Sequence, residues 1–211
     1  MKKALFFDLD GTLWNALTPL CESWNKAMEE HGLKYRFDLK SMTSYMGLTP
    51  AETVPLAFKD VDFKTGLDYF NICLEAEIGY LKDHPGFLYP HEEEVIRRIS
   101  SIYPIYIISN SGKGYVENYL NSCHMGKYFR GHLCVGDTGL VKSDNIIYLK
   151  KKENIDRVIY IGDTKKDLDE SRKAGVDFIH ASYGFGKIDE KIPAISSLSD
   201  LEKEVETVFS L

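Results

Sequence analysis

Short apolar runs alternate along the chain with longer segments in which apolar residues recur every three or four positions. Each run is long enough for one buried strand and too short for a helix. The runs are residues 4–7 (ALFF), 105–108 (IYII), 158–161 (VIYI) and 178–180 (FIH). Cys134-Val135 predicts a further short strand before a turn at 136–139. Strands that are apolar along their length are typical of a parallel sheet covered on both faces.

Two long amphipathic helices are predicted soon after the first strand. One covers residues 16–31 and the other runs from Phe63 to Leu81, because their apolar residues follow helical spacing. Between them, residues 41–50 are expected to form a polar loop centred on Gly47, with Pro50 able to open a short helix. This block therefore predicts a helical insertion after the first strand.

Further helices separate the later strands. One ends at Ile102 before Pro104, one runs from Asp167 to Ala174 before Gly175, and one around Val205 closes the chain. We therefore predict a doubly wound α/β fold, a Rossmann-like parallel sheet with an inserted all-α cap. The expected division is residues 1–14 and 86–211 for the α/β core and residues 15–85 for the cap.

Composition and charge exclude several classes of partner. No run of 18 apolar residues is present, so we expect no membrane partner, and the first strand begins too early for a signal peptide. The net charge of −6 argues against a nucleic-acid partner. The four cysteines are widely spaced with no CxxC pattern, which is typical of reduced thiols in a cytoplasmic protein. A monomer and a homodimer are both compatible with the sequence.

Polar residues follow three of the predicted strands at the point where each strand ends. They are Asp8 with Asp10, Ser109 with Asn110, and Asp163 with Asp167 one helical turn further on. Asp8 and Asp10 can face one site because residues two apart on an extended chain point the same way. The carboxyl ends of parallel strands meet at one edge of a sheet, where ligands bind. We therefore expect these side chains to share one cleft.

Four carboxylates in one cleft repel each other, and a hard divalent cation such as Mg²⁺ removes that repulsion. Ser109 opens a turn whose backbone N–H groups suit an anion. Lys142 follows the turn at 136–139 and supplies a fixed positive charge, with Lys113 as the competing lysine. A metal, a hydroxyl, backbone amides and an ammonium around a carboxylate describe a phosphoryl-transfer site.

The ordered motifs resemble those of haloacid-dehalogenase-superfamily phosphatases, in particular the phosphoglycolate-phosphatase-like group with a helical cap. The family's four motifs match, in order, DLDGT at Asp8 to Thr12, Ser109-Asn110, Lys142, and Gly162-Asp163-Thr164 with Asp167. In the family the third-motif lysine is often followed by proline, whereas Ser143 follows it here. The resemblance spans nearly the whole chain.

The resemblance implies a Mg²⁺-dependent phosphatase that hydrolyses a small phosphorylated metabolite, a phosphate monoester, through an aspartyl-phosphate. Asp8 would be the nucleophile, and Asp10 would protonate the leaving oxygen and then activate water. Ser109 and Asn110 would bind the phosphoryl oxygens, and Lys142 would neutralise charge and steady Asp8. The implied metal ligands are Asp8, Asp163 and the backbone carbonyl of Asp10, with Asp167 orienting the metal shell.

Trp14 and Gly47 are the candidate substrate contacts at the cap. The loop around Gly47 contains no Arg or Lys, which gives little support for a second anionic group held by the cap. Thr12 has either a supporting role in the first loop or a direct one. Gly184-Phe185-Gly186 resembles a glycine-rich loop of the same group and is equally compatible with a plain turn.

The same motifs and fold occur in proteins with other functions, which are the alternatives to a phosphatase. A phosphosugar mutase of the β-phosphoglucomutase type shares these motifs, but it needs a cap that grips a second phosphate. Dehalogenation needs neither an acid at Asp10 nor a metal, and a phosphonate hydrolase would need a cap lysine such as Lys26 or Lys34. A non-catalytic binding protein on the same fold is the alternative from a different class.

Overall fold

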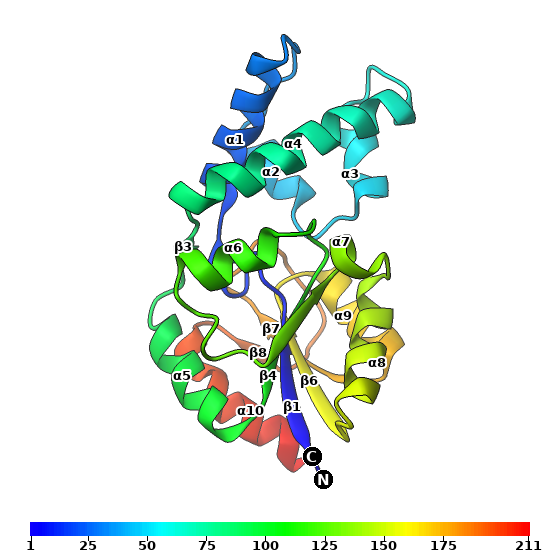
Figure 1. Ribbon diagram of the computed structural model, residues 1–211. Helices are drawn as coiled ribbons and strands as arrows, with labels where there is room; N and C mark the ends of the chain where they lie inside the picture. Colours follow the sequence, from blue (N-terminus) through cyan, green and yellow to red (C-terminus); the bar gives the residue numbers. More distant parts are fainter.

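A six-stranded parallel sheet forms the centre of the larger part of the molecule (Figure 1). The computed structural model describes all 211 residues. The strand order is β5-β4-β1-β6-β7-β8, which confirms the predicted doubly wound α/β class. The strands are β1 (Lys3–Phe7), β4 (Ile105–Ser109), β5 (Gly131–Cys134), β6 (Arg157–Gly162), β7 (Asp177–Ala181) and β8 (Ala194–Ile195).

Helices cover both faces of this sheet. They are α5 (Glu92–Ile102), α6 (Tyr115–Ser122), α7 (Val135–Thr138), α8 (Lys142–Lys152), α9 (Lys165–Ala174), α10 (Leu201–Ser210) and the 3₁₀ helix η1 (Leu198–Asp200). Because successive strand residues point to opposite faces, Leu5 and Phe7 of β1 pack in a core with α5, α6 and α10. Ala4 and Phe6 pack in a second core with α8 and α9. These two helices lie on the opposite side of the sheet from α5 and α10 (Figure 1). The near-continuous apolar character of β1 follows from this double burial.

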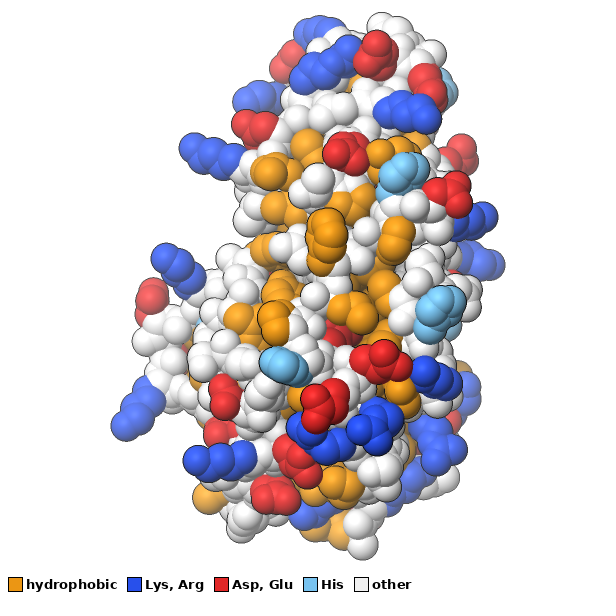
Figure 2. Space-filling view, turned by 90° about the vertical axis from the view of Figure 1, so that its left-hand side faces the viewer, with side chains coloured by type: hydrophobic (Ala, Val, Ile, Leu, Met, Phe, Trp, Pro, Cys, Tyr) orange, Lys and Arg blue, Asp and Glu red, His pale blue; other side chains and the backbone are white.

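Four helices form a separate layer at the other end of the molecule (Figure 1). They are α1 (Leu17–Glu30), α2 (Leu39–Tyr45), α3 (Pro50–Ala57) and α4 (Phe63–Asp83). The chain enters and leaves this layer through a short antiparallel pair, β2 (Trp14–Asn15) with β3 (Phe87–Leu88). Apolar side chains gather at the waist between the two parts, and charged side chains gather toward the two ends (Figure 2). None of the helices combines the length and hydropathy that crossing a bilayer demands.

Two local predictions were wrong. Helix α2 covers residues 39–45 and so overlaps the segment 41–50 that was predicted as a loop. Asp38 caps this helix, because its Oδ1 accepts from the Ser41 N–H at 2.7 Å. Met42 is buried on that helix. Val135, predicted to end a strand, instead begins α7, a one-turn helix that replaces the predicted turn and ends at Gly139 with a φ of 69°.

Candidate active site

The loop after β1 brings its acidic residues close to those that follow β6. Gly11 has a φ of 79°, which glycine adopts without strain. A Cβ at this position would lie 2.2 Å from the Asp163 Oδ2. Because Gly11 has no side chain, the two loops can approach each other closely. This approach brings Asp8 and Asp163 together at one edge of the sheet.

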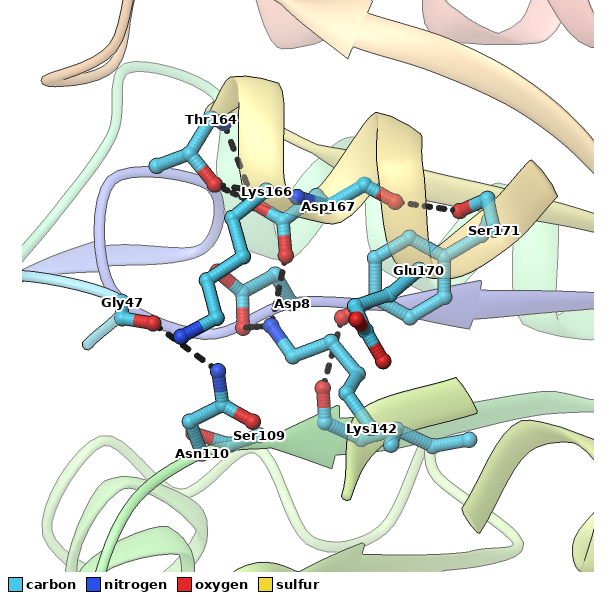
Figure 3. A network of polar contacts seen from close by, with 12 residues as sticks. Asp8, Gly47, Ser109, Asn110, Lys142, Thr164, Lys166, Asp167, Glu170 and Ser171 are labelled. Carbon is cyan, nitrogen blue, oxygen red and sulfur yellow. Dashed lines mark hydrogen bonds and ion pairs between the residues drawn. The ribbon is translucent and has the colours of Figure 1, made fainter. Parts of the chain in front are cut away.

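Lys142 is enclosed between two carboxylates. Its Nζ lies 2.8 Å from Asp8 Oδ1 and 2.6 Å from Asp167 Oδ1 (Figure 3), and only 1% of its surface is exposed. Burial disfavours the ammonium, but the charges of Asp167 and Asp8 outweigh burial and hold the pKa of Lys142 well above its ordinary value. Lys113, the competing lysine, is exposed. The structure thus places Lys142 beside Asp8.

Three buried carboxylates share this edge of the sheet. Asp8, Asp163 and Asp167 each present an oxygen within 4.8 Å of the others. Burial first, and then the charge of Asp167, raises the pKa of Asp8 to about 7 although Lys142 opposes the rise. Burial, and then the charges of Asp167 and Asp8, raise the pKa of Asp163 well above its ordinary value. When all three carboxylates are ionised, the single positive charge of Lys142 does not balance them, and the cluster carries an excess of negative charge.

The surroundings of Asp163 fit a hard divalent cation. Its Oδ2 accepts hydrogen bonds from the N–H groups of Phe185 at 2.7 Å and Gly186 at 3.3 Å. Its Oδ1 is buried and has no hydrogen-bond partner. An orphaned carboxylate oxygen among other carboxylates matches the all-oxygen ligand set that Mg²⁺ prefers. The glycine-rich loop at 184–186 thus has a definite place, because its backbone holds Asp163.

Asp167 is positioned by the first turn of α9. The N–H and hydroxyl of Thr164 donate to its Oδ2 at 3.0 and 2.5 Å, while the Asp167 N–H donates back to the Thr164 hydroxyl at 3.1 Å (Figure 3). This reciprocal cap satisfies donors at the helix start. It also fixes the carboxylate so that Oδ1 faces Lys142.

Asp10 is not one of the three clustered carboxylates, although it lines the same cavity as Asp8. Its Oδ1 accepts from the Tyr115 hydroxyl at 2.8 Å and from the Trp14 indole N–H at 3.1 Å. Burial raises the pKa of Asp10 to about 6, although both hydrogen bonds oppose the rise. Trp14 is fully buried and does not line the cavity described below, so it contacts Asp10 where a substrate contact was expected. Asp10 is expected to bind the metal through its backbone carbonyl. Its carboxyl group would then remain available for acid–base chemistry.

A cavity of about 180 Å³ opens from Asp8 and Asp10 toward the helical layer. Ser109 and Asn110 line it from the end of β4, and Gly47 lines it from the loop after α2. The Asn110 amide donates to the Gly47 carbonyl at 2.9 Å (Figure 3), so this contact joins the helical layer to the sheet. No Lys or Arg lines the cavity.

The sequence indicated a role for Thr12 near this site but gave no indication of Tyr115. Thr12 is fully buried, its hydroxyl has no partner, and its carbonyl accepts from the Tyr183 hydroxyl at 2.8 Å. Its surroundings favour the supporting role over a direct one. Tyr115 was not anticipated, because no sequence pattern connects the start of α6 with Asp10, 105 positions earlier.

The chain is similar to known proteins over most of its length. Residues 5–181 match the model of the haloacid dehalogenase-like hydrolases. A phosphoglycolate phosphatase from Aquifex aeolicus is 26% identical over 209 residues, 95% of each chain. A phosphorylated carbohydrates phosphatase from Thermotoga maritima is 23% identical over 187 residues, 84% of each chain.

Solved structures share the fold. A haloacid dehalogenase-like family hydrolase from Streptococcus pneumoniae superposes with a TM-score of 0.81 at 21% identity, covering 96% of this chain and 98% of its own. The family match spans most of the chain, from within β1 to the end of β7. The chain therefore belongs to the haloacid dehalogenase-like hydrolase family and is an enzyme of that family.

Proposed function

We propose that this hydrolase is a Mg²⁺-dependent phosphatase that acts on a small phosphate monoester through an aspartyl-phosphate on Asp8. The observation that carries this proposal is the setting of the Asp8 carboxylate. Lys142 binds Oδ1, whereas Oδ2 makes no hydrogen bond within the protein, and Asp8 lines the cavity. One oxygen is thus held and the other is available to attack phosphorus.

The positions of Asp8 and Asp10 in one cavity support the following reaction. The free Asp8 oxygen attacks phosphorus, the bond to the leaving oxygen breaks, and Asp10 donates a proton to that oxygen. Asp10, now ionised, takes a proton from the water that attacks the same phosphorus. The bond between phosphorus and the Asp8 oxygen breaks, inorganic phosphate is released, and the Asp8 carboxylate is restored. A pKa of about 6 suits a group that must both give and take a proton near neutral pH. Tyr115 and Trp14 hold Oδ1 of Asp10 and leave Oδ2 for this transfer.

The remaining polar groups balance charge around the phosphoryl group. Asp8, Asp163 and the backbone carbonyl of Asp10 would hold the metal, and Asp167 would orient its shell. When bound, Mg²⁺ neutralises negative charge on the carboxylates and on the phosphoryl oxygens. Ser109 and the backbone of Asn110 bind phosphoryl oxygens at the end of β4, and Lys142 stabilises the charge on Asp8.

Hydrolysis of p-nitrophenyl phosphate tests this proposal. We expect turnover that needs Mg²⁺ and stops with EDTA, and a loss of roughly 10³-fold or more in Asp8→Asn, which removes the nucleophile. Asp189→Asn makes the same chemical change at an exposed position and is the matched control. Circular dichroism establishes that both variants fold. Turnover by folded Asp8→Asn at the wild-type rate would refute the assignment of the nucleophile.

A further inference from the structure

A buried carboxyl group lies in the wall of the same cavity, within the helical layer. Glu77 of α4 is only 4% exposed and lines the cavity together with Asp8 and Asp10. Within the protein it makes one hydrogen bond, from the Trp24 indole N–H to Oε2 at 2.8 Å. It forms no ion pair, and no Lys or Arg lines the cavity. A carboxyl buried without a positive partner is costly to ionise, so its presence requires an explanation.

The contact with Trp24 does not explain the choice of an acid. An amide oxygen would accept the same hydrogen bond without the cost of burying a charge. Burial raises the pKa of Glu77 to about 8, and the charge of Asp10 adds to the rise, while the Trp24 hydrogen bond opposes it. The protein therefore supplies no group that would balance a negative charge on Glu77.

Aromatic side chains surround the same part of the cavity. Trp24, Tyr45 and Phe70 all line it. Trp24 stacks on Tyr45 with ring centroids 6.2 Å apart, and it meets Phe70 edge to face at 5.6 Å. An acid among aromatic rings, with no competing Lys or Arg, is the combination that recognises an organic cation.

We propose that the leaving group of the substrate carries a protonated amine that binds Glu77, so that the substrate is the phosphate monoester of a small amino alcohol. This inference rests on the proposed function, because Asp8 and Asp10 act on the phosphoryl end of the same molecule. The ammonium supplies the positive charge that the wall around Glu77 lacks. A leaving group with its own carboxylate, as in phosphoglycolate, would place a negative charge beside Glu77 with no cation to balance it. Binding of such a substrate is therefore disfavoured.

A panel of matched esters tests the proposal on the wild-type enzyme. We would measure kcat/KM for 2-aminoethyl, 2-hydroxyethyl, ethyl and carboxymethyl phosphate, and for the corresponding three-carbon amine, alcohol and alkyl esters. The amine ester should exceed its hydroxyl analogue by on the order of 10-fold and the carboxymethyl ester by on the order of 100-fold. Equal values for amine and hydroxyl esters at both chain lengths, or a preference for carboxymethyl phosphate, would overturn the proposal.

The variant Glu77→Gln separates the effect of the negative charge of Glu77 from the effect of its size and shape. Glu77→Gln keeps an acceptor for Trp24 but removes the charge, so the ratio of amine-ester to alkyl-ester kcat/KM should fall by on the order of 10-fold. Glu75→Gln makes the same change at an exposed position of α4 and should keep the wild-type ratio. An unaltered ratio in folded Glu77→Gln would contradict the assignment.

Hydrolysis of p-nitrophenyl phosphate distinguishes the failure of this inference from the failure of the proposed function. If the wild type hydrolyses that ester with Mg²⁺ but shows no preference for amines, the amino-alcohol substrate is refuted and the phosphatase stands. If the wild type hydrolyses neither p-nitrophenyl phosphate nor any ester of the panel, both fail.

Discussion

Replacement of Lys142 by methionine removes the ammonium that contacts two of the three clustered carboxylates, Asp8 and Asp167. Its Nζ bonds Asp8 at 2.8 Å and Asp167 at 2.6 Å, and its 1% exposure leaves almost no access for water to replace it. Removal of one partner from a buried ion pair costs about 3–5 kcal/mol. Because two pairs are lost together and methionine roughly preserves the volume, we expect a cost near the upper part of that range. That cost is a large share of the stability of an ordinary domain.

Urea denaturation followed by far-UV circular dichroism, in EDTA at neutral pH, measures this cost. With a slope of about 2 kcal/mol per molar urea, a loss of about 5 kcal/mol lowers the midpoint by about 2.5 M. Lys113→Met is the matched control and should stay within about 0.5 kcal/mol of wild type, because Lys113 is exposed. Saturating Mg²⁺ should restore part of the loss, since it supplies positive charge to the same carboxylates. A Lys142→Met midpoint equal to that of wild type would refute the reasoning.

Three further predictions concern Asp10, a buried carboxyl group of α5 and the metal site. Tyr115→Phe removes a hydrogen bond to Asp10 and should lower kcat for an alkyl phosphate by roughly 10-fold; unchanged steady-state kinetics would contradict this. Burial raises the pKa of Glu92 from 4.5 to about 8, so the folded protein holds a proton that the unfolded chain releases. Its contribution to stability is therefore fully present below about pH 4.5 and is lost as the pH rises toward 8. Glu92→Gln should flatten that loss in urea titrations, and parallel pH profiles would argue against it. Mg²⁺ at 100 times its Kd should stabilise the wild type by ~2.7 kcal/mol, and Asp163→Asn should abolish the accompanying rise in Tm; an equal rise in that variant would remove Asp163 from the metal site.

Residues placed by short stretches of sequence were predictable. Asp8, Ser109 and Asp163 each follow an apolar run, so their position at the end of a strand can be read locally. Their meeting at one edge follows from the parallel sheet. The pattern also predicted the long helices, because burial on one face imposes a helical period.

Residues that reach the site through packing between distant helices were not predictable in the same way. Tyr115 approaches Asp10 only because α6 lies between the sheet and α4 (Figure 1). The position of Glu77, in contrast, could be inferred from the sequence. It follows Phe70 and Leu74 at helical spacing, which places an acid on the buried face of α4. The Asp38 cap of α2 is a similar short-range pattern inside a segment that is otherwise polar.

The central claim is that Asp8 becomes phosphorylated during turnover. Asp10→Asn with p-nitrophenyl phosphate and Mg²⁺ tests this most directly. That leaving group departs without a proton, so phosphorylation proceeds, whereas hydrolysis of the intermediate needs Asp10 as the base. Rapid mixing should release about one nitrophenolate per enzyme in a burst, and mass spectrometry of the quenched protein should find the phosphoryl group on Asp8. Steady turnover without a burst, with an unmodified Asp8 peptide, would contradict the account.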